Sequence, residues 1–489
     1  MSKLYVFAIG GSGARVFNQF IMMLASGVNL GEFTEVRPIL IDLDVNHMIP
    51  TNILCEKYLA INDRYWKTGS TQNKFFGTKI SKTKYSVDNQ QQEAFIYPLK
   101  IDNNQEQFRK YIGYDSMGGK DADLASLLFS DDNFNTNLEM GCKGQPNIGS
   151  VIFCNEYLNQ NINEALSGYD PESDRVCIVS SCFGGTGASG FPALIKKISE
   201  MLHDTVFIGS ISIQPYFKVE GEIESPFPSR VQVSLDYYRN HILDSKVLYF
   251  AGDKESYDSN VYEKNIGSME QVVADKAHLV EFAAAAAIFD FARKERNVLT
   301  AKINENRMTA PINRQSARYI YGNDENNIPN LLNLKYIFNR GNLDADIRKY
   351  LSAFYLFTCF LKNSPEYVLS KDQLWVDKFK VNGDKLNDFS SFCCSCTKNC
   401  LQIFKEMSEI PQKFKPFNEC RTEKNAMSVR ADIPGKNLSA GGCFLGFWKK
   451  TGYAYILRSL NENANRSRNL LELFSKVFLG IISKKYGNR

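Results

Sequence analysis

Residues 175–190 have the sequence RVCIVSSCFGGTGASG, in which an apolar run changes at once into glycines and small hydroxyl residues. An apolar run without alternation is typical of a strand buried on both faces of a parallel sheet. Residues 191–202 follow with the apolar spacing of a helix. The stretch therefore predicts a strand, a glycine loop and a helix in direct succession, the repeating unit of a doubly wound α/β fold.

The same succession opens the chain. Residues 4–9 predict a first buried strand and residues 16–24 a helix, and the loop between them contains Gly10, Gly11, Ser12 and Gly13. Further strands are expected at residues 36–41, 205–213 and 247–251, and further helices at residues 231–242 and 344–361. At least five such alternations predict a doubly wound parallel sheet with helices on both faces.

The length of 489 residues exceeds what one hydrophobic core normally serves, so we expect two or three structural units, and the sequence patterns divide the chain into two. The first, residues 1–295, holds the sheet and ends in a central helix at about residues 269–293. Within it, residues 56–149 lose the regular pattern and predict a partly exposed insertion. The second unit, residues 296–489, is expected to be an α+β domain that ends in a basic helix at residues 459–485.

The composition favours a folded, soluble protein. With 44% hydrophobic and 23% charged residues, the chain does not have the composition of a disordered protein, and its net charge of +4 does not indicate nucleic-acid binding. No apolar segment reaches the roughly 20 residues that a membrane span requires. The apolar start of the chain is followed by glycines and lacks a small-residue cleavage site, so it is expected to be a strand and not a signal peptide. We therefore expect a cytoplasmic protein.

Twelve cysteines are few for a chain of 489 residues, which favours reduced thiols over disulfides. Five of them gather near one another in the sequence: Cys393, Cys394, Cys396, Cys400 and Cys420. The group is interpreted mainly as structural thiols. A zinc site is the alternative, although the group lacks the paired C-x-x-C spacing typical of such sites.

Two glycine loops at the carboxyl ends of predicted strands suit a phosphate-binding site. The second loop contains Gly184, Gly185, Thr186, Gly187, Ala188, Ser189 and Gly190. Glycines let backbone amides approach a phosphate, and the helix that follows adds the positive end of its dipole. The alternative is that the glycines only let each strand turn tightly into its helix.

Residues 180–191 (SSCFGGTGASGF) resemble the phosphate-binding signature of the tubulin/FtsZ superfamily. Residues 10–13 are similar to the first nucleotide loop of that family, with Asn18 where FtsZ-like proteins have an asparagine near the base. Residues 41–44 resemble the acidic VDLE segment of tubulin, and residues 275–287 its central helix. The resemblance covers about residues 1–295 and is nearer to the divergent prokaryotic tubulin-like proteins than to tubulin or FtsZ themselves.

The resemblance implies GTP or GDP as the ligand, with Mg²⁺. The residues of both glycine loops would hold the phosphates, Asp42 and Asp44 would lie near them, and Asp44 would serve the magnesium ion indirectly or through a phosphate. Ala188 is an additional residue in the second loop. The asparagine that selects guanine in the family is replaced by Gly252 and Asp253, and Asp253 can still accept hydrogen bonds from guanine.

Hydrolysis in this family requires an acidic loop that a neighbouring subunit contributes. The nearest likeness here is Asn342, Asp344 and Asp346, which lie about 50 residues further along the chain than the family's loop does. Asp344 and Asp346 are therefore candidate catalytic residues, and the alternative is that they stabilise the start of a helix. His278 in the central helix either approaches the base or is an interior residue.

The last segment carries nine lysine and arginine residues against two glutamates from residue 449 to the end of the chain. A basic amphipathic helix there predicts an anionic membrane or an acidic protein as a partner, or simply packing of its apolar face on the chain itself.

Three functions are compatible with these patterns. The first is a slow, assembly-dependent GTPase of the tubulin type that self-associates into oligomers or filaments. The second is a nucleotide-binding sensor or scaffold subunit that does not hydrolyse its ligand. The third, a dinucleotide enzyme, is disfavoured because Gly10, Gly11 and Gly13 do not complete G-x-G-x-x-G.

Overall fold

The computed structural model of the chain describes residues 2–66, 73–87, 90–99, 106–202, 206–216, 218–219, 227–241, 247–252, 261–262, 277–295, 317–319, 342–363, 373–409, 432–433, 436–437 and 448–486. Its centre is a sheet that has eight strands in these residues. The strands are β1 (Lys3–Ile9), β2 (Glu35–Asp42), β3 (Lys79–Ile80), β6 (Ile96–Pro98), β7 (Arg175–Ser181), β8 (Ile208–Ile213), β10 (Val247–Ala251) and β12 (Ala317–Tyr319).

All the pairings in this sheet are parallel, and its order is β12-β10-β8-β7-β1-β2-β3, with β6 also paired to β2. From β1 the chain moves outward through β2, then returns to place β7 on the other side of β1 and moves outward in the opposite direction. This is a doubly wound α/β sheet, as predicted. The switch point, where the direction of winding reverses, lies between β1 and β7.

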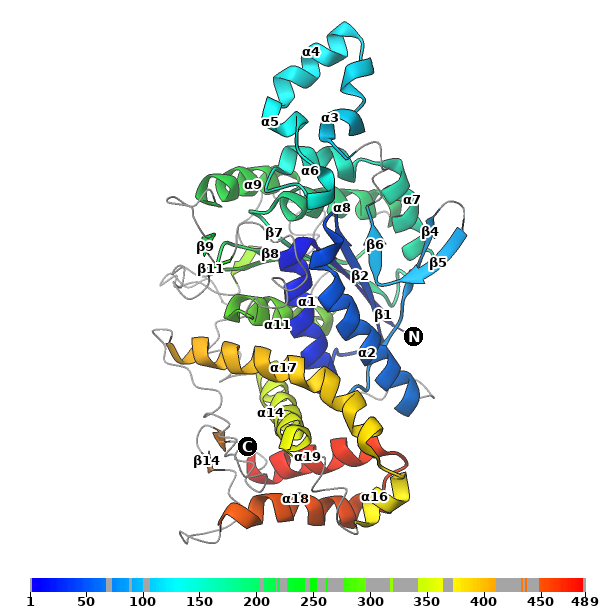
Figure 1. The fold of residues 1–489 in the computed structure, drawn as a ribbon, viewed down its shortest axis with the longest axis vertical. Coiled ribbons are helices and arrows are strands. Elements are labelled where there is room, and N and C mark those ends of the chain that lie inside the picture. The colour runs from blue at the N-terminus through cyan, green and yellow to red at the C-terminus, as the bar shows by residue number, and fades with distance from the viewer. Residues whose placement is uncertain are drawn as a thin grey trace.

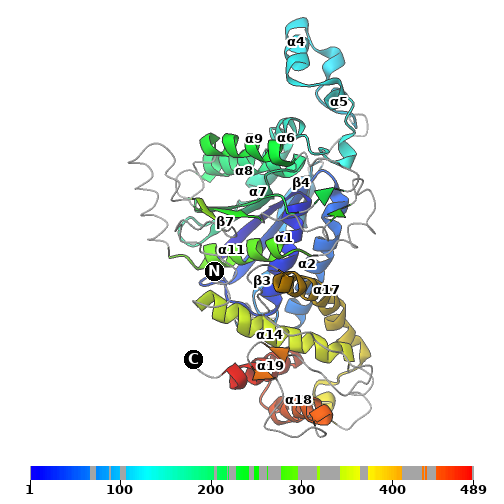
Figure 2. The same cartoon turned by 90° about the vertical axis from the view of Figure 1, so that its left-hand side faces the viewer.

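Helices cover both faces of the sheet. Figure 2 shows it between one layer that contains α7 (Glu156–Ala165), α8 (Gly185–Leu202) and α9 (Phe227–His241), and a second layer that contains α1 (Gly10–Ala25) and α11 (Leu279–Arg293). The second layer also includes α2 (Ile49–Tyr65), which packs against α1. The prediction of helices on both faces is confirmed.

Two helices begin earlier than predicted. The sequence places the start of the first helix near residue 16 and the start of the helix after strand 175–180 at residue 191, but α1 begins at Gly10 and α8 at Gly185. Glycine has a low helix propensity, so the glycines were expected to form loops. In the structure they form the first turns of both helices, where neighbouring groups leave no room for a side chain at Gly13, Gly185, Gly187 and Gly190.

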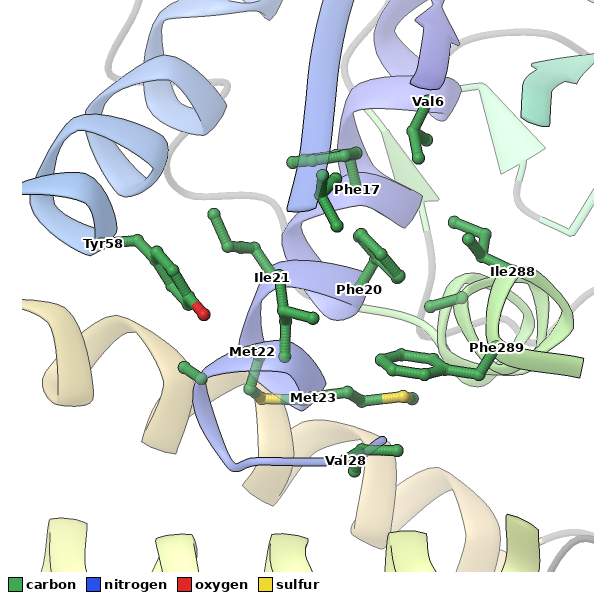
Figure 3. Close-up of a cluster of buried hydrophobic side chains, with 14 of the residues drawn as sticks. Val6, Phe17, Phe20, Ile21, Met22, Met23, Val28, Tyr58, Ile288 and Phe289 are labelled. Carbon is green, nitrogen blue, oxygen red and sulfur yellow. The ribbon is translucent and has the colours of Figure 1, made fainter. Parts of the chain in front are cut away.

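Helix α1 is buried on nearly all sides, and its buried residues include the polar Gln19. Figure 3 shows its residues Phe17, Phe20 and Ile21 between Tyr58 of α2 and Phe289 of α11. The rings of Phe20 and Phe289 lie 5.0 Å apart. The alanines of α11, Ala283 to Ala287, have no exposed surface. Because their side chains are small, α11 can lie close to both the sheet and α1.

The predicted insertion is more ordered than its sequence indicates. It supplies β3 and β6 to the sheet, which were not predicted because they are only two and three residues long. The other elements of this region are β4 (Thr83–Val87), β5 (Gln90–Ala94), α3 (Phe108–Tyr111), η2 (Tyr114–Ser116), α4 (Gly119–Leu128), α5 (Asp131–Phe134), η3 (Leu138–Met140) and α6 (Pro146–Phe153). Figure 1 shows α3, α4 and α5 projecting at one end of the molecule.

The C-terminal helices form a further layer beneath α1, α2 and α11 (Figure 1). They are α14 (Asn342–Asn363), α16 (Leu374–Phe379), α17 (Gly383–Glu409), α18 (Trp448–Ala464) and α19 (Leu470–Tyr486). One continuous hydrophobic core runs from β1 to α19. The sheet also crosses the boundary expected near residue 295, because β12 pairs with β10. Short strand pairs complete the described elements: β9 (Lys218–Val219) with β11 (Val261–Tyr262), and β13 (Asp432–Ile433) with β14 (Lys436–Asn437).

The single basic helix predicted at residues 459–485 is wrong, because the chain breaks between α18 and α19. The side chain of Asn469 accepts a hydrogen bond of 2.8 Å from the backbone N–H of Glu472 and so caps a new helix. The apolar residues of α19 are buried, and Phe474 and Phe478 pack on Phe357 of α14 at ring distances of 5.0 and 5.4 Å. The interpretation that this apolar face packs on the chain itself is confirmed.

Within the described residues, no helix is long and apolar enough to cross a membrane.

Gly13 lies where no side chain fits, so substitution of this residue tests the packing of α1 on the sheet. A Cβ at Gly13 would lie 2.9 Å from the carbonyl oxygen of Val179 and 3.0 Å from the carbonyl carbon of Ala8, both of them sheet backbone. Gly13→Ala should therefore lower the free energy of unfolding by about 1–3 kcal/mol. Gly480→Ala in α19 is the matched control, because nothing lies within 4 Å of its added Cβ. The control should raise stability by about 0.5–1 kcal/mol. Urea unfolding measures both, and a Gly13→Ala variant as stable as the parent would contradict the packing described.

Candidate functional site

The candidate site lies at the switch point, where the carboxyl ends of β1 and β7 are neighbours. Helix α1 begins directly after β1, and α8 begins four residues after β7, so both N-termini lie at the same edge of the sheet (Figure 1). No side chain caps the first turn of α1. Open α/β sheets bind ligands at such an edge, where free N–H groups and positive helix dipoles converge.

The two glycine loops are in contact with each other. A Cβ at Gly10 would lie 3.4 Å from the backbone nitrogen of Gly187. Gly10 also has a φ of +71°, which favours glycine. The predicted pairing of the two loops is therefore present in the fold, and residues from distant parts of the sequence meet there.

Several glycines of the second loop are required by close packing. A Cβ at Gly185 would lie 2.5 Å from Cβ of Cys142, one at Gly187 would lie 2.7 Å from the hydroxyl of Ser180, and one at Gly190 would lie 2.4 Å from the ring of Phe153. These three positions have a structural role whatever else they do. Gly11, Ser12 and Gly184 are only partly buried, and we call the surface that they form the open side of the site.

The hydroxyl groups of the second loop are already hydrogen-bonded within the protein. Thr186 donates 2.8 Å to Oδ1 of Asp42 at the end of β2. Ser189 donates 2.8 Å to the carbonyl of Gly185, one turn earlier in α8. Ala188 is buried, and its N–H donates to the carbonyl of Gly184. Thr186 therefore links the second glycine loop to the acidic segment, while Ser189 supports its own helix.

Asp42 and Asp44 are 3% and 5% exposed, so both carboxylates are almost buried at the carboxyl edge of the sheet. Oδ1 of Asp44 accepts 3.0 Å from the N–H of Asn46 and caps the short helix η1 (Val45–His47). Oδ2 of Asp42 lies 3.1 Å from Nδ1 of His47. The predicted acidic residues therefore do lie beside the glycine loops.

His47 belongs to this site, although the sequence reasoning did not select it. Its Nε2 lies 3.8 Å from Oδ2 of Asp44, and a Cβ at Gly11 would lie 3.4 Å from the ring. The ring thus covers the first glycine loop and contacts both carboxylates. One signal was available, because the chain has only four histidines and this one follows Asp44 by three residues.

A third glycine segment covers the start of α8. Gly141 and Gly144 have φ values of +77° and +73°, which lets residues 141–145 fold tightly against Gly185. Cys142 in this segment is 2% exposed, and burial raises the pKa of its thiol to about 12, so the thiol is protonated. The guanidinium of Arg230 lies against Gly144 and brings a positive charge to the edge of the site. No periodic pattern in the sequence indicates these contacts.

Asn18 lies on the face of α1 that begins with Gly11, two turns further along the helix. Its Oδ1 is buried and has no hydrogen-bond partner among the described residues. Asp253, the other residue expected near a base, lies outside the described residues. Asn18 therefore offers a buried hydrogen-bond acceptor on α1.

His278 is the N-cap of α11 and has no exposed surface. Its Nδ1 accepts a hydrogen bond of 3.0 Å from the N–H of Val280, so the proton of the neutral ring is on Nε2. Burial, together with the nearby charge of Arg15, lowers the pKa of His278 to about 3 and keeps the ring neutral. Of the two interpretations of His278, the structure supports the one in which it is an interior residue.

A partly buried ion pair joins α1 to α11 next to His278. Nε of Arg15 lies 2.6 Å from Oε1 of Glu281, and the hydroxyl of Tyr216 donates 2.8 Å to the same oxygen. Oε2 of Glu281 accepts from the N–H of His278 and completes the cap of α11. The helix that carries the first glycine loop is therefore fixed to the start of the central helix.

The candidate catalytic residues lie in α14, away from the switch point of their own chain (Figure 1). Asp346 is an ion-pair partner of Arg293 at the end of α11, with a distance of 2.8 Å. Asp344 is in the first turn of α14, and its side chain lies outside what the structure describes. A role for either residue in this chain's own site is therefore not supported by the geometry, and the prediction concerns only a neighbouring copy.

The cysteine group lies partly in α17. Cys393 and Cys396 are buried, Cys394 is exposed, and burial raises the pKa of the Cys393 thiol. The side chain of Cys400 and all of Cys420 lie outside the described residues. In the described part of the chain, no three histidine, cysteine or acidic side chains come together as metal ligands.

Comparison with known proteins adds no assignment: no family model matches the sequence, and no curated protein is significantly similar to it. Function must therefore be argued from the site. Converging helix N-termini and glycine-lined backbone suit a polyanion such as a phosphate chain. The two adjacent carboxylates suit a divalent cation that accompanies it.

The hydrogen bond from Thr186 to Asp42 holds the two halves of the site together, and its removal can be measured. Thr186→Val replaces the hydroxyl with a methyl group and leaves one oxygen of a buried carboxylate without its donor, which should cost about 1–3 kcal/mol of stability. Thr186→Ser keeps the donor and loses only one methyl group, so it should cost under about 1 kcal/mol. Urea unfolding of both variants checks this, and equal stabilities would argue against the bond.

Proposed function

We propose that this chain binds a guanine nucleotide with Mg²⁺ at the switch point, in the manner of the tubulin/FtsZ superfamily. The observation that carries the proposal is the meeting of both glycine loops with Asp42, through the approach of Gly10 to Gly187 and the hydrogen bond of 2.8 Å from Thr186. The resemblance of residues 180–191 to the family's signature supports this proposal, and so does the convergence of two helix N-termini, which favours an anion there.

In this proposal the phosphates contact the open side of the site. The backbone N–H groups of Gly11, Ser12 and Gly184 lie at the two helix starts, where donors and dipoles favour an anion. Asp42 and Asp44 repel phosphate unless a cation lies between them, and Mg²⁺ supplies that charge when bound. Asp44 serves the ion indirectly or through a phosphate.

The base is proposed to lie beside α1, near Asn18. The unpartnered Oδ1 of Asn18 can accept a hydrogen bond from an amino or ring N–H group of guanine. Asp253 is proposed as a second acceptor. A buried acceptor that a ligand satisfies gives selectivity, because a ligand without the matching donor leaves it unpaired.

Hydrolysis is proposed to be slow and to depend on self-association. Asp344 and Asp346 would act on the nucleotide of a neighbouring copy. The ion pair of Asp346 with Arg293 favours the second candidate function, a nucleotide-binding sensor or scaffold that does not hydrolyse its ligand, because it gives this carboxylate a structural role.

Gly11→Asp tests the site directly. The added carboxylate would stand at the mouth of the first loop, and two unit charges about 4 Å apart repel by about 4 kcal/mol at an effective dielectric constant of about 20. GTP binding in the presence of Mg²⁺ should weaken by at least about a hundredfold, or about 2.7 kcal/mol. Gly11→Asn has the same size without the charge and should bind far more tightly than Gly11→Asp. Isothermal titration calorimetry measures both, and equal affinities in the two variants would place the phosphates elsewhere. Gly185 is unsuitable for this test because any Cβ there meets Cys142.

The second test concerns hydrolysis. If a neighbouring copy completes the site, GTP turnover per chain should rise with protein concentration, and Asp344→Asn with Asp346→Asn should lower it at least tenfold with little change in GTP affinity. Arg293→Gln is the control, because it removes the partner of Asp346 and keeps the carboxylate. Equal losses in the control and the acidic variants would assign Asp346 a purely structural role. No turnover at any concentration would favour the sensor or scaffold.

A further inference from the structure

One end of the molecule carries a small projecting unit, residues 106–140, which we call the acidic arm (Figures 1 and 2). Its hydrophobic cluster is separate from the main core and extends to Leu43 and α6. Within the arm, the ring of Phe129 packs on Phe108 at 4.8 Å and the ring of Tyr114 packs on Phe134 at 4.4 Å. Ala125 of α4 is buried in the same cluster. The arm is therefore a folded unit whose surface has a defined shape.

The arm exposes three leucines on its helix α4. Leu124 is 55% exposed, Leu127 is 84% exposed and Leu128 is 60% exposed. They are spaced by three and four residues, so they share one face of the helix, and the buried Ala125 lies at the edge of that face. Single exposed leucines are ordinary, but a cluster of three on the outer face of a projecting helix indicates a contact surface.

The surroundings of these leucines are acidic. Asp121 and Asp123 lie in α4 itself and are exposed, beside one exposed basic residue, Lys120. Residues 106–140 contain seven acidic and three basic side chains, a net charge of −4, in a chain whose total is +4. The occupant of the leucine face should therefore be basic and carry exposed apolar surface.

The opposite end of the same chain has these properties. Residues 448–486 contain eight basic and two acidic side chains, a net charge of +6. Arg458 of α18 and Arg466, between α18 and α19, are exposed. Leu374 of α16, which packs against α18, is 47% exposed. We call the surface formed by α16, α18 and α19 the basic end.

The acidic arm and the basic end lie at opposite ends of the longest axis of the molecule (Figure 1). They cannot meet within one chain. Their complementary charges and exposed leucines can meet only between two chains, and such a contact is head to tail. A contact that joins two different surfaces of identical chains repeats until a ring closes or a filament grows.

We propose that the acidic arm of one chain docks on the basic end of a second copy, with Leu124, Leu127 and Leu128 as its apolar centre and Asp121 and Asp123 facing arginines of the basic end. The proposal shares with the proposed function only the expectation of self-association. It names the surfaces involved, and it does not depend on nucleotide binding.

Charge reversal tests the contact on the full chain. Sedimentation velocity over a range of protein concentrations, at low and high salt and with and without GTP, measures the average mass. The arm variant, Asp121→Lys with Asp123→Lys, and the end variant, Arg458→Glu with Arg466→Glu, should each need at least tenfold more protein to associate. Mixed in equal amounts they should associate again, because a reversed arm then faces a reversed end. High salt should weaken the association of the parent.

Apolar variants complete the test. Leu124→Ser with Leu127→Ser should also raise the required concentration at least tenfold. Val233→Ser on α9 changes an exposed residue outside both surfaces, 70% exposed in this structure, and should behave as the parent does.

Each other outcome overturns the proposal. A parent that stays monomeric under all conditions, or variants that associate as the parent does, would show that this contact does not form. An arm variant whose association is not restored by the end variant would instead indicate an arm-to-arm contact or another partner. GTP affinity is measured on the same samples. Assembly without GTP binding would contradict the proposed function and leave the docking proposal standing. GTP binding without assembly would contradict the docking proposal and leave the proposed nucleotide binding standing.

Discussion

The close approach of α1 to the backbone of β1 and β7 is the constraint on which this structure depends. At Gly13 the helix lies so near the sheet that a Cβ would fall 2.9 Å from the carbonyl oxygen of Val179. Backbone cannot move away from such a contact without disturbing two paired strands, so the position requires glycine. The same approach brings Gly10 to Gly187 and places two helix starts side by side. The candidate site is therefore a consequence of how α1 packs.

Helix α11 extends this arrangement towards the C-terminal helices. Its alanines let it lie between the sheet and α1, and both of its ends are held by charged groups. At the start, Glu281 is paired with Arg15 of α1. At the end, Arg175 of β7 donates to the carbonyl groups of Phe291 and Ala292, and Arg293 pairs with Asp346 of α14. Arg15 of α1 is thus connected through Glu281, helix α11 and the ion pair of Arg293 with Asp346 to the layer of C-terminal helices.

Sequence patterns predicted the parts of this fold that are long and locally encoded. Apolar runs identified β1, β2, β7, β8 and β10, and two glycine runs identified the switch point. The patterns failed where a contact is made by distant residues. The strands β3 and β6 are too short to have a period, and α8 begins in glycines that alone would not form a helix. His47 and Cys142 reach the site only through the fold, because each meets a partner on another element. The role of Asp346 was ambiguous in sequence, since an acidic first turn serves helix stability and chemistry equally.

The central claim is that the switch point holds a nucleoside triphosphate with Mg²⁺. Native mass spectrometry of the full chain, incubated with GTP and Mg²⁺ and separately with ATP or a nicotinamide dinucleotide, tests it most directly. The account predicts one bound guanine nucleotide per chain, retained with Mg²⁺ and lost when Mg²⁺ is removed by a chelator. A chain that stays free of GTP under these conditions, or that takes up the dinucleotide in its place, would contradict it.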